Sequence, residues 1–216
     1  MAEKVVIGNA VLYLADCREV LPLLPRFDLV LTDPPYGVLM NANPGRRAKL
    51  TEQIAGDAVA PDVAWMAGHK AIVWGGNNFC LPRSTGWLVW DKCHPDESQH
   101  SQAELAWTNV VRTVRHYREA YHGFMRQRDG WFHPTQKPPG LMRWCIGLTD
   151  AECVFDPYMG SGTAGIAAME TGRRFIGVEI HRPYFDIACR RIEQAQAQGQ
   201  LIPPEPPREC VQAGLL

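Results

Sequence analysis

The stretch ECVFDPYMGSGTAGIAAMETGRRFIGVEI, from Glu152 to Ile180, decides the fold. Its two ends, 152–157 and 174–180, are short and rich in Val, Ile and Phe, which is typical of buried strands. Between them lie a glycine-rich turn and a helix that closes on Gly172. This alternation of strand, helix and strand predicts an α/β protein with a mostly parallel, doubly wound sheet.

The same alternation extends through most of the chain. Further buried strands are predicted at 27–33, 70–76 and 86–92, and further helices at 138–149 and 182–198. The simplest interpretation of such a chain is a single domain with an insertion.

The domain is expected to span residues 1–198, with an insert at about 93–132. Prolines can neither continue a helix nor join a sheet, so the Pro-rich tail at 199–216 is expected to be flexible.

The composition indicates a globular protein of neutral overall charge. The chain has 216 residues, of which 46% are hydrophobic, and a formal net charge of -1, so any polyanion must meet a local basic surface. Its seven cysteines show no C-x-x-C spacing and are interpreted as reduced. Neither a signal peptide nor an apolar run of membrane-spanning length is visible, so we expect a cytoplasmic protein without a membrane partner.

The glycine-rich turn is a candidate cofactor site. Gly160, Gly162 and Gly165 form a G-x-G-x-x-G pattern, in which the backbone approaches a ligand closely at a helix N-terminus. The next strand ends near Glu179, where an acidic residue meets ribose hydroxyls in Rossmann-like folds. Together they favour an adenosine-containing cofactor. A dinucleotide, or a plain tight turn with a surface carboxylate, stays open at this point.

A second junction, LTDPPYG at 31–37, ends another predicted strand. Pro34 and Pro35 stiffen the turn because each has a fixed φ and lacks an N–H. The turn offers the Asp33 carboxylate and main-chain carbonyls, all acceptors, beside the ring of Tyr36. Acceptors next to a stacking ring suit the exocyclic amine of a nucleobase.

With these motifs, the chain resembles the amino-group DNA methyltransferases that use S-adenosylmethionine, in the subgroup whose catalytic motif precedes the cofactor motif. The resemblance covers most of residues 5–195 and implies a Rossmann-like methyltransferase sheet. It rests on DPPYG, GWLVWDK, AELAWTN, HPTQKP, FDPYMGSGT and FIGVEI, which occur in the family's order. The chain departs slightly from the family pattern at Tyr158 and Met159.

The resemblance implies roles on both sides of a site. Asp33 and the Pro34 carbonyl would hold the target amine of a base flipped out of DNA, and Tyr36 would stack on that base. Glu179 and the glycine turn would bind the ribose and methionine parts of S-adenosyl-L-methionine, Asp16 would lie near its adenine, and Thr135 and Lys137 would help to hold its carboxylate. The full expected cofactor set is Asp16, Asp33, Thr135, Lys137, Asp156, Pro157, Tyr158, Gly160, Ser161, Gly162, Thr163 and Glu179. No metal is expected.

Two basic clusters are candidate DNA surfaces. One follows the catalytic turn and the other lies in the predicted insert; their members are Arg46, Arg47, Lys49, Arg112, Arg115, Arg118, Arg126 and Arg128. Basic clusters are more often solvated faces, and only the flanking motifs favour DNA.

The resulting hypothesis is a site-specific, adenine-N6 DNA methyltransferase. Alternatives are the same chemistry on cytosine N4 or on an RNA base, and a non-catalytic nucleotide-binding or NAD-dependent module. The aspartate of DPPY favours adenine because cytosine-N4 members of the family more often have serine there. A homodimer is compatible with the resemblance, and no restriction partner is visible in the chain.

Overall fold

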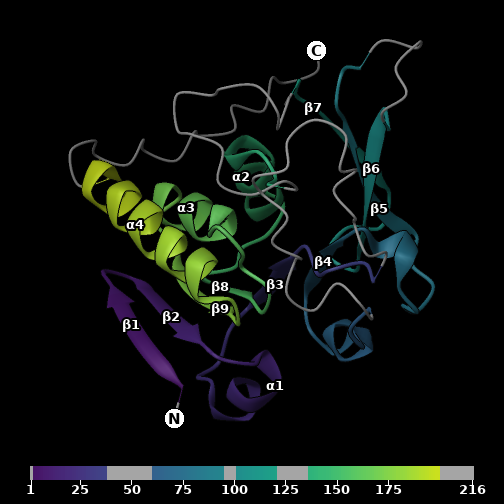
Figure 1. The fold of residues 1–216 in the computed structure, drawn as a ribbon. Helices are drawn as coiled ribbons and strands as arrows, with labels where there is room; N and C mark the ends of the chain where they lie inside the picture. Colours follow the sequence, from purple (N-terminus) through teal and green to yellow (C-terminus); the bar gives the residue numbers. More distant parts are fainter. Residues whose placement is uncertain (1, 38–59, 95–100, 121–135, 200–216) are drawn as a thin grey trace, which may run out of the picture.

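The computed structural model describes residues 2–37, 60–94, 101–120 and 136–199 (Figure 1). The strands are β1 (Glu3–Ile7), β2 (Ala10–Leu14), β3 (Leu29–Thr32), β4 (Ala71–Trp74), β5 (Gly86–Asp91), β6 (Ala103–Thr108), β7 (Val114–Arg118), β8 (Cys153–Asp156) and β9 (Arg174–Glu179). The helices are α1 (Cys17–Val20), α2 (Pro139–Gly147), α3 (Thr163–Glu170) and α4 (Arg182–Gly199), with 3-10 turns η1 (Leu21–Leu23), η2 (Ala64–Gly68) and η3 (Gly76–Asn78).

These strands form one sheet in the order β1-β2-β9-β8-β3-β4-β6-β5-β7. The central strands β2, β9, β8, β3 and β4 pair in parallel, and β5 also pairs in parallel with β7. The antiparallel pairs are β1 with β2 and β6 with β4 and β5. The predicted α/β fold with a mostly parallel sheet is therefore confirmed.

The sheet has a separate hydrophobic core on each face. Helices α2, α3 and α4 lie side by side on one face (Figure 1). Successive residues of a strand point to opposite faces, and β3 contributes Leu29 and Leu31 to the helical core but Val30 to the other. That second core also contains Val20 of α1 and Met66 of η2.

Four strands were not predicted: β1, β2, β6 and β7. Strand β7 has the sequence VRHYR, exposes most of its residues and lies at the edge of the sheet, where β5 is its one partner among the described strands. A strand of this kind lacks the apolar run by which buried strands were predicted. Both β6 and β7 fall within the predicted insert at 93–132 and extend the sheet. The predicted tail at 199–216 lies outside the described residues, apart from Gly199 at the end of α4.

The cysteines that the structure describes are all free. Within the described ranges, no helix combines the length and apolar character needed to cross a bilayer.

Candidate active site

Three acidic residues meet where parallel strands end. Asp33 follows β3, Asp156 ends β8 and Glu179 ends β9. All three line one cavity of about 750 Å³. Ligands of open α/β sheets bind at this carboxyl edge. The fold thus brings the catalytic turn and the glycine turn, distant in sequence, to a common space.

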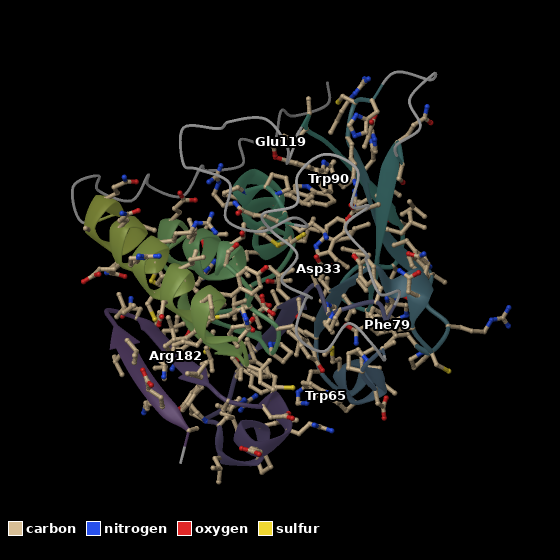
Figure 2. All side chains as sticks on the ribbon, viewed as in Figure 1. Asp33, Trp65, Phe79, Trp90, Glu119 and Arg182 are labelled. Atoms are coloured by element: carbon tan, nitrogen blue, oxygen red, sulfur yellow. The ribbon has the colours of Figure 1, made fainter. Side chains whose placement is uncertain are left out.

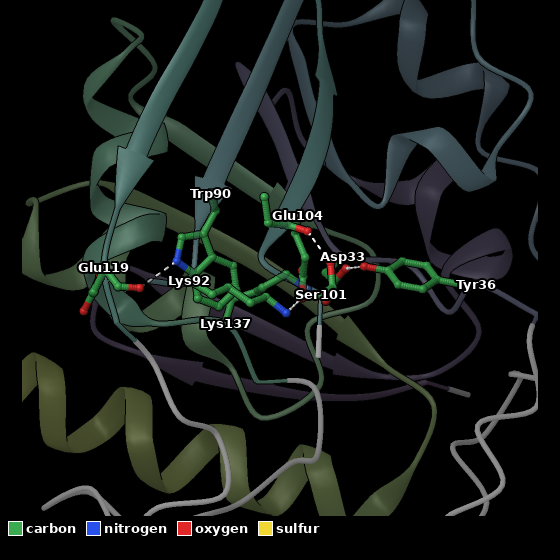
Figure 3. A network of polar contacts seen from close by, with 9 residues as sticks. Asp33, Tyr36, Trp90, Lys92, Ser101, Glu104, Glu119 and Lys137 are labelled. Atoms are coloured by element: carbon green, nitrogen blue, oxygen red, sulfur yellow. Dashed lines mark hydrogen bonds and ion pairs between the residues drawn. The ribbon is translucent and has the colours of Figure 1, made fainter. Parts of the chain in front are cut away.

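One wall of the cavity is the turn that follows β3. Pro34, Pro35 and Tyr36 line the cavity with Asp33, and Tyr36 Oη donates a hydrogen bond of 2.6 Å to Asp33 Oδ1 (Figure 3). A Cβ on Gly75, whose φ is +66°, would lie 2.1 Å from the Tyr36 ring, so the ring packs directly on the Gly75 backbone. Burial raises the pKa of Tyr36 far above its usual value, which keeps its hydroxyl a donor.

Asp156, a buried carboxyl, lies beside this turn, because it ends β8, the strand next to β3. Thr32 Oγ1 and the Tyr158 amide both donate to Asp156 Oδ1, at 2.7 and 3.0 Å. Burial raises the pKa of Asp156 to about 7, and these hydrogen bonds only partly oppose it. The cavity therefore holds a carboxylate that a cationic ligand would stabilise.

Glu179 is held by two backbone amides. Gly160 N donates to Glu179 Oε2 at 2.9 Å, and His181 N donates to Oε1 at 2.8 Å. Burial nevertheless raises the pKa of Glu179. Because a carboxylate has about four acceptor sites, both oxygens retain acceptor capacity for hydroxyl groups.

The glycines of the turn play different parts. Gly160 (φ +51°) lines the cavity, and a Cβ there would meet no atom within 4 Å. Gly162 (φ +81°) does not line the cavity; a Cβ there would lie 3.0 Å from the Ala188 Cβ of α4. Gly162 allows α4 to pack on the turn, and its contact with the cofactor stays a prediction. Arg191 of α4 also donates to the Ser161 carbonyl at 2.6 Å.

The remaining described members of the predicted cofactor set all line the cavity: Asp16, Pro157, Tyr158, Ser161, Thr163 and Lys137. Asp16 also caps α1 and pairs with Arg18, which lowers the Asp16 pKa. Thr135 lies outside the described residues.

The predicted DNA surface is described only in part. Arg46, Arg47, Lys49, Arg126 and Arg128 lie outside the described residues. Arg112, Arg115 and Arg118 are exposed and do not line the cavity. Arg115 and Arg118 have opposite parity on β7, so they leave opposite faces of the sheet and do not form one cluster there.

Sequence reasoning missed several residues around the site. Trp65, Gln136 and Tyr184 line the cavity. Glu104, on β6, forms an ion pair with Lys137. Figure 2 shows the described side chains, with Asp33 and Trp65 labelled. Glu104 lies in the AELAWTN motif quoted above, whereas Trp65 and Tyr184 have no local signal.

Comparison with protein families decides the assignment. The sequence profile described as "DNA methylase" matches residues 73–190, which is more than half of the chain. The chain belongs to the DNA methylase family. Within this DNA methylase match lie the glycine turn, Glu179, Lys137 and Glu104, whereas the DPPY turn at 31–37 precedes it.

The chain aligns with only part of the length of its relatives in the DNA methylase family. The chain is 43% identical to the type II methyltransferase M2.DpnII of Streptococcus pneumoniae, over 49% of this chain and 50% of the relative. It is 42% identical to the DNA adenine methyltransferase YhdJ of Escherichia coli, over 29% of this chain and 22% of the relative. The chain thus spans half or less of the length of these relatives.

A solved structure supports the fold of this DNA methylase chain. The M1.HpyAVI–SAM complex superposes with a TM-score of 0.51 at 19% identity, covering 84% of this chain and 98% of that chain.

Proposed function

We propose that this chain transfers a methyl group from S-adenosyl-L-methionine to the N6 amine of an adenine flipped out of DNA. The observation that carries the proposal is the common cavity, which is lined by the acceptor-rich DPPY turn together with Asp156, Glu179 and residues of the glycine turn. Membership of the DNA methylase family supports DNA as the substrate.

The cavity residues fit this cofactor. The cavity has a volume of about 750 Å³, which is within the usual range for a small-molecule site. Asp156 would hold the cofactor's ammonium, and Glu179 would accept from the ribose hydroxyls. Gly160 leaves open space beside the backbone where the methionine part would lie. A solved structure of similar fold, M1.HpyAVI, is a SAM complex, which supports the same choice.

The DPPY turn suits activation of an amine. The adenine amine is a weak nucleophile because its lone pair is delocalised into the ring. Asp33 and the Pro34 carbonyl would each accept one N–H and favour a more tetrahedral nitrogen. The nitrogen lone pair then forms the C–N bond while the methyl–sulfur bond breaks, its electron pair staying on sulfur, and the methylated nitrogen releases one proton to solvent water. Positioning and electrostatic stabilisation make up most of this catalysis.

Adenine is preferred over cytosine for two reasons. The turn has aspartate where cytosine-N4 members of the family more often have serine, and the relative YhdJ is named a DNA adenine methyltransferase. A contact between DNA and Arg112, Arg115 or Arg118 stays a prediction, as does a homodimer.

Methylation of random-sequence DNA tests the proposal. The full chain is incubated with DNA and S-adenosyl-L-methionine, the DNA is digested, and its nucleosides are measured by mass spectrometry. N6-methyladenine is the expected product, and mapping the modified positions gives the recognised site. N4-methylcytosine alone would reassign the base, and unmodified DNA would contradict the proposed reaction.

Asp156→Asn should change the stability of the fold and the affinity for the cofactor in opposite directions. The pKa of Asp156 in the folded state, about 7, exceeds its ordinary value of 3.8, so its contribution to stability falls as pH rises from about 4 to about 7. The loss is on the order of 4 kcal/mol. Asn carries no charge and keeps the acceptor for Thr32 and Tyr158. The variant should melt higher than wild type at pH 8 and equally at pH 4, yet bind the cofactor more weakly.

Thermal melting at both pH values and cofactor calorimetry check this result. An unchanged cofactor affinity would remove Asp156 from the cofactor set. A lower melting temperature at pH 8 would contradict the cost assigned to its buried charge.

A further inference from the structure

A row of alternating charges leads away from the cavity wall (Figure 3). Its members are Asp33, Lys137, Glu104 and Lys92. The Lys137 ammonium pairs with Asp33 Oδ2 and lies 3.0 Å from Glu104 Oε2, and Glu104 also pairs with Lys92. Asp33 and Lys137 line the cavity, whereas Glu104 and Lys92 do not.

Lys137 is buried deeply enough to need both carboxylates. Its side chain is 5% exposed, and a buried ammonium is costly unless charged partners surround it. Burial alone would lower its pKa, but Asp33 and Glu104 hold the pKa of Lys137 well above its usual value. Lys137 is therefore a permanent cation between two carboxylates.

Glu104 is an ionised carboxylate on a strand inside the sheet. Burial favours its neutral form, but Lys137 and Lys92 outweigh burial and lower its pKa, so the side chain is ionised. Its backbone lies in β6, which pairs with β4 on one side and β5 on the other. The contact with Lys137 is an ion pair; Glu104 Oε2 has no aligned hydrogen-bond donor among the described residues.

This geometry connects Lys137 to the DPPY turn. The family resemblance implied that Lys137 helps to hold the methionine carboxylate. In the structure its ammonium already has two carboxylate partners, and the cofactor's carboxylate would have to compete with them. Asp33, in contrast, is held at both oxygens, by Tyr36 at Oδ1 and by Lys137 at Oδ2.

We propose that Glu104 is a positioning residue, which holds the Lys137 ammonium so that this ammonium fixes the Asp33 carboxylate at the cavity wall. The inference rests on the proposed function, in which Asp33 receives the target amine. Glu104 touches neither substrate nor cofactor and acts only through Lys137. Without the charge of Glu104, the ammonium loses one of its two carboxylate partners and is no longer held in place, so the Asp33 carboxylate loses its fixed orientation.

The first test compares Glu104→Gln with Glu170→Gln. Both changes neutralise the carboxylate of an ion pair, but Glu170 pairs with Arg143 and lies away from the cavity. For Glu104→Gln, kcat for methyl transfer to DNA should fall about 10- to 100-fold, the cost of a small misplacement of a reacting group. Its cofactor dissociation constant, from calorimetry, should not change. Glu170→Gln should keep the wild-type kcat.

A double-mutant cycle with Lys137→Met distinguishes positioning from a merely structural role. If Glu104 acts through Lys137, Glu104→Gln has no further effect on kcat once Lys137 is replaced. Independent structural roles would make the two losses multiply. Single-turnover assays with a radioactive methyl group measure the slow variants.

A second variant keeps the proposal testable if Glu104→Gln does not fold, which could follow because that change removes one counter-charge of a buried lysine. Glu104→Asp keeps the charge but withdraws the carboxylate from Lys137, and it should also lower kcat in a protein that melts cooperatively. A wild-type kcat in the folded variants, or multiplying losses in the cycle, would overturn the proposal. If the wild-type protein transfers no methyl group in the same assay, the proposed function fails, and this inference with it.

Discussion

Asp33→Asn is expected to lower the rate of methyl transfer by about 10²- to 10³-fold, the usual cost of losing one preorganised polar contact to a transition state. Asn has the size of Asp but carries no charge, and it replaces one acceptor oxygen with an NH2 donor. The Tyr36 and Lys137 donors that now meet both Asp33 oxygens would face only one acceptor. The target amine would then lose the acceptor that activates it.

Cofactor binding should survive in Asp33→Asn because the expected cofactor contacts Asp156, Glu179 and Gly160 belong to β8, β9 and the glycine turn, not to the DPPY turn. Single-turnover rates and cofactor calorimetry measure the two effects. Asp150→Asn is a suitable control, since Asp150 forms an exposed ion pair with Lys70 and does not line the cavity. Methyl transfer at the wild-type rate in Asp33→Asn would show that this carboxylate is not the amine acceptor.

Gly160→Ala and Gly162→Ala form a matched pair with opposite expected results. Both glycines have a positive φ, so each substitution costs about 1–2 kcal/mol of backbone strain. In Gly162→Ala the new methyl group also lies 3.0 Å from the Ala188 Cβ and 3.2 Å from Ile192 Cδ1. This crowding should cost about 1–3 kcal/mol more, so Gly162→Ala should be clearly the less stable variant.

Gly160→Ala should instead affect the ligand, because its methyl group meets no protein atom and lies at the cavity. We expect a larger loss of cofactor affinity than in Gly162→Ala, after correction for the unfolded fraction. Urea unfolding and calorimetry provide both quantities. Equal unfolding free energies for the two variants would argue against the packing role of Gly162, and unchanged affinity in Gly160→Ala would argue against the glycine turn as the cofactor wall.

Sequence alone determined the features that depend on neighbours along the chain. Apolar runs at 27–33, 152–157 and 174–180 predicted β3, β8 and β9 because a strand buried on both faces must be apolar throughout. The stiffness of the DPPY turn and the glycine pattern are equally local. Since ligands bind where parallel strands end, the position of the cavity followed from these elements.

Only the tertiary structure decided which side chains meet and which way a turn faces. Asp33 and Lys137 are 104 positions apart, and Glu104 reaches Lys137 from β6, a strand that the apolar pattern did not reveal. Gly162 belongs to the expected glycine pattern, yet it faces α4, because the packing of that helix sets the orientation of the turn. Ion pairs across a sheet depend on strand order and register, and these arise from long-range pairing that no short stretch of sequence specifies.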